Sequence, residues 1–212
     1  MKRIVFWFDP ISPYAYLAFE QLPQALMGCS YEVQYRPVLF AGLLKHWGQK
    51  GPAEIEPKRA WTYRQIAWIA HRHGITLQLP RVHPFNPLPL LRLALAAGEA
   101  GDLPNRRVVE RLMRHVWHGG HDALDPARLA ALAAAVAPMR DPASDAVKAE
   151  LRALGDEALA RGLFGVPTFE VDGRVFWGFD ALPMIKAALD GDAWFDGPAW
   201  AAAGSAPPGT LR

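Results

Sequence analysis

The stretch RIVFWFDPISPYAYLA (residues 3–18) contains a strand and the start of a helix. Its first six residues are apolar, β-branched or aromatic apart from Arg3, which is typical of a buried strand. A helical pattern then runs to about Met27, and Pro13 falls at its first position, where the missing N–H costs nothing. Ser12 precedes it and is of a residue type that caps helix N-termini. The stretch therefore predicts a strand, a turn and a helix, with a serine at the junction.

A second strand is predicted over YEVQYRPVLF (31–40), where apolar and polar side chains alternate. The helix between the strands can cross over the sheet, so we expect the two strands to be parallel. Pro23 should end or kink that helix. The first forty residues thus predict a βαβ unit.

The middle of the chain, 41–162, has almost no strand signal. Several of its segments begin with Pro or Asp-Pro and end with Gly, an asymmetry typical of helices. The helices predicted there cover 57–74, 86–101, 104–120, 125–137 and 141–162.

Strands return after Gly165. The segments PTFEV and RVFWG flank Asp172-Gly173, the strongest short signal for a β-hairpin. A last helix is predicted over 180–191. This order of elements predicts an α/β protein with a thioredoxin-like fold (βαβ … ββα) and a large all-helical insertion.

The same order suggests domain limits. We expect a thioredoxin-like domain from 1–40 and 163–192, a helical insertion domain at 41–162 and a C-terminal tail at 193–212. Within the tail, Pro207-Pro208-Gly209 is expected to be disordered.

The composition limits the kinds of partner. The chain has 212 residues, is 51% hydrophobic and carries a formal charge of +2, which gives no electrostatic argument for binding nucleic acid or an anionic membrane. No apolar run reaches the length of a membrane span, and the N-terminus lacks a signal-peptide core, so we expect a cytoplasmic protein. The only cysteine is Cys29, which excludes an intramolecular disulfide and a cysteine-based zinc cluster.

The serine at the junction admits two interpretations. Thioredoxin-fold oxidoreductases carry Cys-x-x-Cys at this place, where the helix N-terminus lowers the thiol pKa. Here the slot holds Ser12-Pro13-Tyr14-Ala15, which excludes dithiol redox chemistry. Ser12 is then either a helix cap alone or a hydroxyl that also acts on a ligand.

Four motifs favour the second interpretation. SPYAYLA, PVLFAGLLK, HPFNPL (83–88) and GVPTF…WGFD together resemble the family of 2-hydroxychromene-2-carboxylate isomerases and kappa-class glutathione transferases, within the wider DsbA-like group. The resemblance covers residues 3–190. It implies glutathione as the cofactor, with Ser12 as the catalytic residue that hydrogen-bonds the sulfur and favours its thiolate.

The resemblance also implies the other glutathione contacts. Val166, before a cis Pro167, would pair with the glutathione backbone. Gly178, Phe179 and Asp180 would hold the γ-glutamyl end at the start of the last helix.

Contacts with the organic substrate are implied by the variable parts of the chain. Asn86 matches a family asparagine that faces the substrate, although it could equally form a turn or cap a helix. Lys45 or Lys50 would bind the substrate carboxylate. Where the family usually has Asn followed by a basic residue and Pro-Pro, this chain has Gln49 before Lys50 and Gly51-Pro52. Because of this departure, the sequence leaves open whether Gln49 contacts glutathione.

Lys58 and several aromatic residues are further candidates for ligand contacts. Lys58 corresponds to a lysine that recurs in the family, although a solvent-exposed charge at the start of a helix is the simpler interpretation. Tyr14, Trp61 or Trp117 could stack on an aromatic ring.

The implied activity is glutathione-dependent interconversion of 2-hydroxychromene-2-carboxylate and trans-o-hydroxybenzylidenepyruvate, in the catabolism of naphthalene-type compounds. The alternatives are a kappa-type glutathione transferase or peroxidase and a non-catalytic thioredoxin-fold binding module. A homodimer is expected by analogy.

Three histidines, His115, His118 and His121, recur at spacings of three. Gly119-Gly120 interrupts the helix between the last two, which separates the face that they would share. We therefore expect loop or surface histidines and no metal site.

Overall fold

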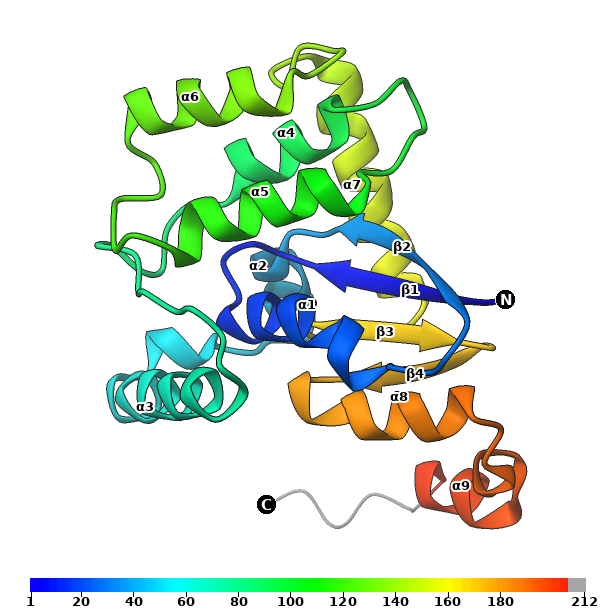
Figure 1. The fold of residues 1–212 in the computed structure, drawn as a ribbon. Coiled ribbons are helices and arrows are strands. Elements are labelled where there is room, and N and C mark those ends of the chain that lie inside the picture. Colours follow the sequence, from blue (N-terminus) through cyan, green and yellow to red (C-terminus); the bar gives the residue numbers. More distant parts are fainter. Residues whose placement is uncertain (206–212) are drawn as a thin grey trace.

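The computed structural model describes residues 1–205 and contains one four-stranded mixed sheet (Figure 1). The strand order is β2-β1-β3-β4, with β1 parallel to β2 and antiparallel to β3, and β3 antiparallel to β4. The strands are β1 (Lys2–Phe8), β2 (Tyr31–Pro37), β3 (Thr168–Val171) and β4 (Arg174–Trp177). This arrangement confirms the predicted thioredoxin-like βαβ and ββα units.

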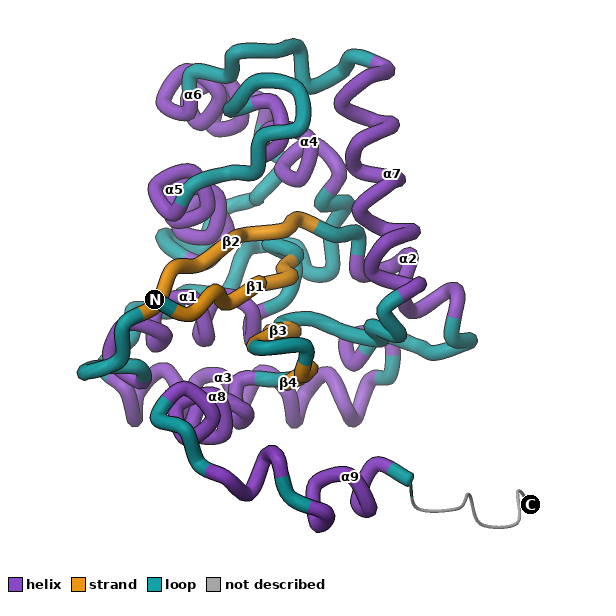
Figure 2. Tube along the Cα trace, turned by 90° about the vertical axis from the view of Figure 1, so that its right-hand side faces the viewer, coloured by secondary structure: helices purple, strands orange, loops and turns teal. Residues whose placement is uncertain are grey.

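The two faces of the sheet are covered by different helices, because successive side chains of a strand point to opposite faces. Ile4, Phe6 and Phe8 of β1 share a cluster of buried residues with α1 (Pro13–Ala25) and α8 (Leu182–Leu189). Trp7 lies in another cluster with residues of α2 (Phe40–His46) and α7 (Asp145–Ala160). Figure 2 shows α2 and α7 on one side of the sheet and α1 and α8 on the other.

All five helices predicted in the middle of the chain are present. They are α3 (Glu56–His73), α4 (Leu88–Ala96), α5 (Arg106–Trp117), α6 (Pro126–Val136) and α7, with a short 3₁₀ helix at Pro52–Glu54. Side chains of Asn105, Asp125 and Ser144 cap α5, α6 and α7. No helix within residues 1–205 combines the length and the apolar character needed to cross a membrane.

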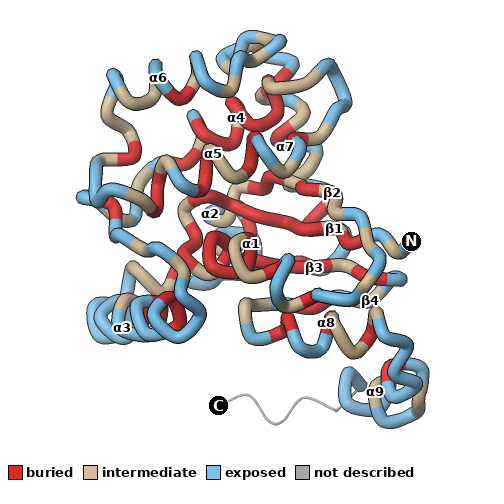
Figure 3. The backbone as a smooth tube through the Cα atoms, viewed as in Figure 1, coloured by how far each residue is buried: buried red, intermediate tan, exposed pale blue. Residues whose placement is uncertain are grey.

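The helical segment packs directly onto the sheet. Leu90, Leu93 and Val109 belong to the same buried cluster as Phe6 of β1. Figure 3 shows that buried residues continue from the strands into α4 and α5, whereas most residues of α3 are exposed. The division into a thioredoxin-like domain and an insertion domain stays a prediction.

Two local expectations were wrong. The second strand was expected to continue to residue 40, but β2 ends at Pro37 and α2 begins at Phe40. Residues 193–204 were expected to belong to a tail, but they form a 3₁₀ helix (Ala193–Asp196) and α9 (Pro198–Gly204). The tail folds back because Phe195 is buried against Phe176 of β4, with ring centroids 5.7 Å apart. The disorder expected at 207–209 concerns residues outside those described.

The hairpin between β3 and β4 has the predicted turn. Asp172 and Gly173 have φ angles of 49° and 78°. Positive φ at both central residues is what a type I′ turn requires, and Gly accepts it without steric penalty.

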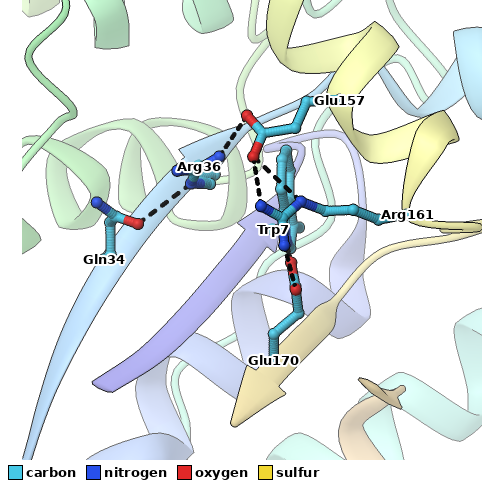
Figure 4. Close-up of polar contacts among 6 residues, drawn as sticks. All are labelled: Trp7, Gln34, Arg36, Glu157, Arg161 and Glu170. Atoms are coloured by element: carbon cyan, nitrogen blue, oxygen red, sulfur yellow. Dashed lines mark hydrogen bonds and ion pairs between the residues drawn. The ribbon is translucent and has the colours of Figure 1, made fainter. Parts of the chain in front are cut away.

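A network of charged side chains fixes α7 to the sheet (Figure 4). Glu157 of α7 forms ion pairs with Arg36 of β2 and with Arg161, and Arg161 also pairs with Glu170 of β3 at 2.8 Å. Partial burial alone would raise the pKa of Glu157, but hydrogen bonds and charge from Arg36 and Arg161 lower it. The guanidinium of Arg36 lies over Trp7, 5.1 Å from the ring centroid. This network holds α7 against β2 and β3.

Candidate functional site

Ser12 is both a helix cap and a bridge to the second half of the chain. It is only 5% exposed, and its Oγ accepts a hydrogen bond from the Ala15 N–H at 3.2 Å. The same hydroxyl donates to the carbonyl oxygen of Val166, also at 3.2 Å. A serine hydroxyl carries one proton. To donate to a ligand, Ser12 must therefore release Val166.

The segment opposite Ser12 has the predicted geometry. The Val166–Pro167 peptide bond is cis. The Pro167 carbonyl accepts a hydrogen bond from the Gly178 N–H at 2.9 Å, which ties this segment to the end of β4. Gly178 has a φ of 101°, a conformation that L side chains rarely adopt. Ser12, Val166, Pro167 and Gly178 are thus joined by a continuous series of contacts.

Tyr14 and Asp180 complete this side of the site. The Tyr14 hydroxyl donates to Oε1 of Gln65 in α3 at 2.7 Å. Partial burial raises the pKa of Tyr14, and the nearby charge of Asp180 raises it further. Phe179, in the 3₁₀ turn Phe179–Ala181, lies edge-on to His73, with ring centroids 5.4 Å apart. The first turn of α1 and the 3₁₀ turn before α8 therefore both contact α3.

Sequence reasoning missed the buried carboxylate of Asp9. Its Oδ1 accepts from the Ile11 N–H at 3.0 Å, and its Oδ2 accepts from the Phe40 N–H at 2.9 Å. Complete burial raises the pKa of Asp9 to about 7, although the two hydrogen bonds act in the opposite direction. The Asp9 carboxyl joins the loop before Ser12 to the N-terminus of α2. The available signal was an acidic residue directly after an apolar strand.

Two aromatic side chains hold the carbonyl groups of the same loop. Trp117 donates from Nε1 to the Pro10 carbonyl at 2.9 Å. Nε2 of His83 lies 2.8 Å from the Ile11 carbonyl, and its Nδ1 lies 2.8 Å from the Tyr63 hydroxyl. Burial lowers the pKa of His83, so the imidazole is neutral at pH 7, donates from Nε2 and accepts at Nδ1.

These contacts correct one expectation and explain the shape of the loop. Trp117 was considered for stacking on an aromatic ligand, but its side chain is fully buried and its N–H is used by Pro10. The Asp9 carbonyl accepts from the Ser12 N–H at 3.0 Å. The carbonyls of Asp9, Pro10 and Ile11 are therefore all satisfied, and the loop presents Ser12 in one defined position.

The first turn of α1 leaves one N–H without a partner. Pro13 has no N–H, and the N–H groups of Ala15 and Tyr16 bind Ser12. Within residues 1–205, neither the Tyr14 N–H nor the Val166 N–H donates a hydrogen bond to another group. These two N–H groups and the Ser12 hydroxyl are donors that suit an anion.

The residues expected after the second strand are not joined to this site. Lys45, Gln49 and Lys50 are exposed, and within residues 1–205 no hydrogen bond links their side chains to Ser12 or Val166. Their segment is held beside the site by Trp47, which donates from Nε1 to the Leu163 carbonyl at 3.0 Å.

The remaining expected residues lie at the margins. Asn86 accepts the Leu88 N–H at 3.1 Å, which is the turn-forming role left open above. Lys58 and Trp61 are exposed on α3, and Trp61 is 61% exposed.

The three histidines have separate surroundings. Nε2 of His115 lies 2.9 Å from the Ala123 carbonyl, Nε2 of His118 lies 2.8 Å from the Tyr16 hydroxyl, and His121 is exposed. Among residues 1–205, no group of three or more His, Cys, Asp or Glu side chains is placed to hold a metal ion.

Comparison with known proteins places the chain among thioredoxin-fold proteins. Residues 3–190 match the family described as DSBA-like thioredoxin domain. A relative named 2-hydroxychromene-2-carboxylate isomerase from Sphingobium xenophagum is 27% identical over 195 residues, covering 89% of this chain and 98% of the relative. Another, named glutathione S-transferase kappa 2 from Caenorhabditis elegans, is 27% identical over 210 residues, covering 89% and 92%.

Solved structures agree on the fold. A structure of 2-hydroxychromene-2-carboxylate isomerase matches with a TM-score of 0.76 at 22% identity, covering 89% of this chain and 94% of that one. The cytosolic disulfide reductase DsbM from Pseudomonas aeruginosa matches with a TM-score of 0.59 at 17% identity, covering 92% and 100%. At these identities the structural matches concern the fold alone.

Proposed function

This chain belongs to the family of DsbA-like thioredoxin domains, and we propose that it is a glutathione-dependent isomerase. Its substrates are 2-hydroxychromene-2-carboxylate and trans-o-hydroxybenzylidenepyruvate, in the catabolism of naphthalene-type compounds. The observation that carries the proposal is the position of Ser12, which lies at a helix N-terminus against the cis Val166–Pro167 bond, where redox relatives have a cysteine. A hydroxyl there stabilises an anion without forming a disulfide.

The donor set of the site fits a bound thiolate. Ser12 is poised to exchange its bond with the Val166 carbonyl for a bond with sulfur, and the Tyr14 N–H adds a second donor from the helix N-terminus. When bound, glutathione supplies the thiolate that adds to the conjugated carbon and later leaves unchanged, so that the former double bond can rotate. The fixed loop around Ser12 holds the hydroxyl in place for both steps.

Other residues would orient the two molecules. The free Val166 N–H would pair with the glutathione backbone beside Pro167. Gly178, Phe179 and Asp180 would receive the γ-glutamyl end, where backbone N–H groups suit its carboxylate and Asp180 suits its ammonium.

The substrate would lie on the open side of Ser12. Lys45 or Lys50 would bind its carboxylate, and Asn86, Tyr14 and Trp61 would contact its ring. Gln49 would contact glutathione from the same segment as the lysines. All six side chains are partly or fully accessible to solvent, as such contacts require.

A kappa-type glutathione transferase is the second candidate. The 27% identity with the relative named glutathione S-transferase kappa 2 equals that with the isomerase, and both activities need the same thiolate site. The transferase passes the thiol to an electrophile permanently, whereas the isomerase returns it. A stable thioether product would therefore favour the transferase.

The test begins with calorimetric titration of glutathione into the protein, with the thiolate absorbance of bound glutathione followed across pH. We expect binding with a depressed thiol pKa, and a higher thiol pKa in Ser12→Ala. Ser144→Ala is the matched control, because Ser144 also caps a helix, at 3.4 Å from the Val147 N–H, but belongs to α7. It should leave glutathione binding unchanged.

The second stage follows conversion of 2-hydroxychromene-2-carboxylate and identifies the product by NMR. Isomerised product with free glutathione recovered supports the proposal. If glutathione does not bind, or if its thiol pKa is the same in the wild type and in Ser12→Ala, Ser12 is only a helix cap. Either result would favour the non-catalytic binding module. Sedimentation of the purified protein tests the homodimer that we also propose.

A further inference from the structure

A cavity lies apart from Ser12, between α2, α4 and α7. Its volume is about 200 Å³. Most of its wall is apolar, formed by Leu39, Leu43, Leu88, Leu151 and Leu159. None of the residues proposed above for glutathione or for the isomerase substrate lines it. The cavity therefore needs its own explanation.

Two glycines keep this space open. Gly42 lies in α2 and Gly155 in α7, and both line the cavity. Neither has a positive φ, and a Cβ built on either would meet no atom within 4 Å. Glycine is disfavoured relative to alanine inside a helix, and here neither packing nor backbone geometry requires it. What the two glycines provide is volume.

The rim of the cavity is positively charged. Arg92, Lys148 and Arg152 line it, with Asp156 as the single acidic side chain. Lys148 pairs with Asp145, but within residues 1–205 no ion pair includes Arg92 or Arg152. Nε of Arg92 is buried, and no group in the described part of the chain, residues 1–205, accepts a hydrogen bond from it. A buried guanidinium N–H without an acceptor is unfavourable, and an anion in the cavity would satisfy it.

We propose that this cavity binds a small aromatic or alicyclic carboxylate. The ring lies between Gly42 and Gly155 against the leucines, and the carboxylate accepts from Arg92. The size is suitable, because an apolar cavity of about 150 Å³ is known to hold benzene. The apolar wall selects a carboxylate attached to a ring over inorganic phosphate or sulfate. The inference does not rest on the function proposed for Ser12.

The walls of the cavity are held in place. Glu157 and Arg161 bind α7 to β2 and β3 from the side shown in Figure 4. At the start of α2, the Phe40 N–H is held by Asp9. The site is thus preformed, and its ligand would touch the helix that also fixes the loop before Ser12.

The test is a calorimetric titration of the full-length protein with benzoate, and with benzamide as the uncharged analogue of the same shape. We expect benzoate to bind at one site and to bind more tightly than benzamide. Arg92→Gln should weaken benzoate binding by roughly 10- to 100-fold, the range for a hydrogen bond to a charged group, and leave benzamide unchanged.

Filling the cavity provides an independent variant. Gly155→Leu should abolish binding of both compounds, because its side chain occupies the ring position. Gly155→Ala, which makes the same helix-stabilising change with less volume, is the matched control and should still bind benzoate. Thermal unfolding of each variant shows that it is folded, and neither substitution should lower the Tm.

The outcome separates this site from the Ser12 site. Benzoate binding should be the same in Ser12→Ala and in saturating glutathione, and glutathione binding should be the same in Gly155→Leu. The proposal is overturned if the wild-type protein does not bind benzoate or if Gly155→Leu binds it normally. It is also overturned if Ser12→Ala or glutathione removes the binding, since benzoate would then lie at the Ser12 site.

Discussion

The loop that leads to Ser12 and the segment at the end of α2 both flank the proposed glutathione site, but they differ in how far the fold satisfies their polar groups. In the loop, residues 9–12, the three carbonyls before Ser12 accept hydrogen bonds from Ser12, Trp117 and His83. In the segment, residues 45–50, the side chains proposed to meet ligands are exposed. The carbonyl groups of the loop are satisfied by the fold, whereas the side chains of the segment are exposed to solvent.

This difference has an energetic meaning. A loop whose carbonyl groups are satisfied by the fold is already ordered before a ligand binds, whereas each exposed long side chain that is immobilised costs about 0.5–1.5 kcal/mol. The hydroxyl that we propose for the reaction lies in the loop whose carbonyl groups are satisfied. The side chains that we propose for substrate selection lie in the exposed segment, where the chain also departs from its family pattern at Gln49 and Gly51-Pro52.

The largest effect expected from the fixed loop is a pH dependence of stability through Asp9. Its folded-state pKa of about 7 lies above the unfolded value of 3.8, so the folded state binds more protons between these pH values. Its contribution is fully present below about pH 4 and is lost as the pH rises to about 7. At roughly 1.4 kcal/mol per pKa unit, the loss is on the order of 4 kcal/mol.

Urea unfolding of the wild type and Asp9→Ala at several pH values measures this effect. Burial lowers the pKa of His83, His115 and His118, so their contributions rise with pH instead, but they are present in both proteins. The difference between the two proteins should therefore shrink from pH 4 to pH 7. A difference that stays constant would show that the Asp9 pKa is not raised.

The next largest effect is expected from Trp117→Phe, which keeps an aromatic ring but leaves the buried Pro10 carbonyl without a donor. The free energy of unfolding should fall by about 1–3 kcal/mol. Trp68→Phe is the matched control, because Trp68 is 63% exposed and should change stability by less than about 0.5 kcal/mol. Equal losses in both variants would mean that the Pro10 bond contributes nothing.

A smaller loss is expected from Ser12→Ala. The variant lacks the cap on the Ala15 N–H, worth about 1 kcal/mol, and the bond to the Val166 carbonyl, worth about 0.5–1.5 kcal/mol. Ser144→Ala removes only a cap. Chemical denaturation should thus find Ser12→Ala the less stable of the two, and the reverse order would contradict the bridging role of Ser12.

The smallest effects on stability are expected in the exposed segment. Lys45→Ala, Gln49→Ala and Lys50→Ala should each change the free energy of unfolding by less than about 0.5 kcal/mol. The affinity for glutathione should nevertheless fall, or the KM for substrate rise, by up to about fivefold, the range for an exposed charge contact. Unchanged affinity and KM in a variant would remove that residue from the proposed site.

Much of the fold could be predicted from local sequence. The apolar run in β1, the alternation in β2, the Asp172-Gly173 turn and the Pro and Gly residues at helix ends each involve only a few residues, so they can be recognised without the rest of the chain. Errors came where a local pattern was short or ambiguous. The seven-residue α2 follows β2 after two residues, and the apolar run at 38–40 suits a strand as well as a helix.

The C-terminal segment shows why other features escaped prediction. Phe195 and Trp200 belong to a folded structure only because Phe176 of β4 lies beside them. Nothing in residues 193–204 alone indicates that partner, and the same glycines and alanines would suit an exposed tail.

For the candidate site, the sequence by itself determined the residue types: a serine at the start of a predicted helix, a single cysteine elsewhere in the chain, and a Val-Pro in its second half. Only the tertiary structure decided how that serine is held. Asp9 meets Phe40 across 31 residues, Ile11 meets His83 across 72, and Pro10 meets Trp117 across 107. Backbone and side-chain preferences act locally and can be read in order, whereas a buried hydrogen bond needs both partners in place, and that requires the whole fold.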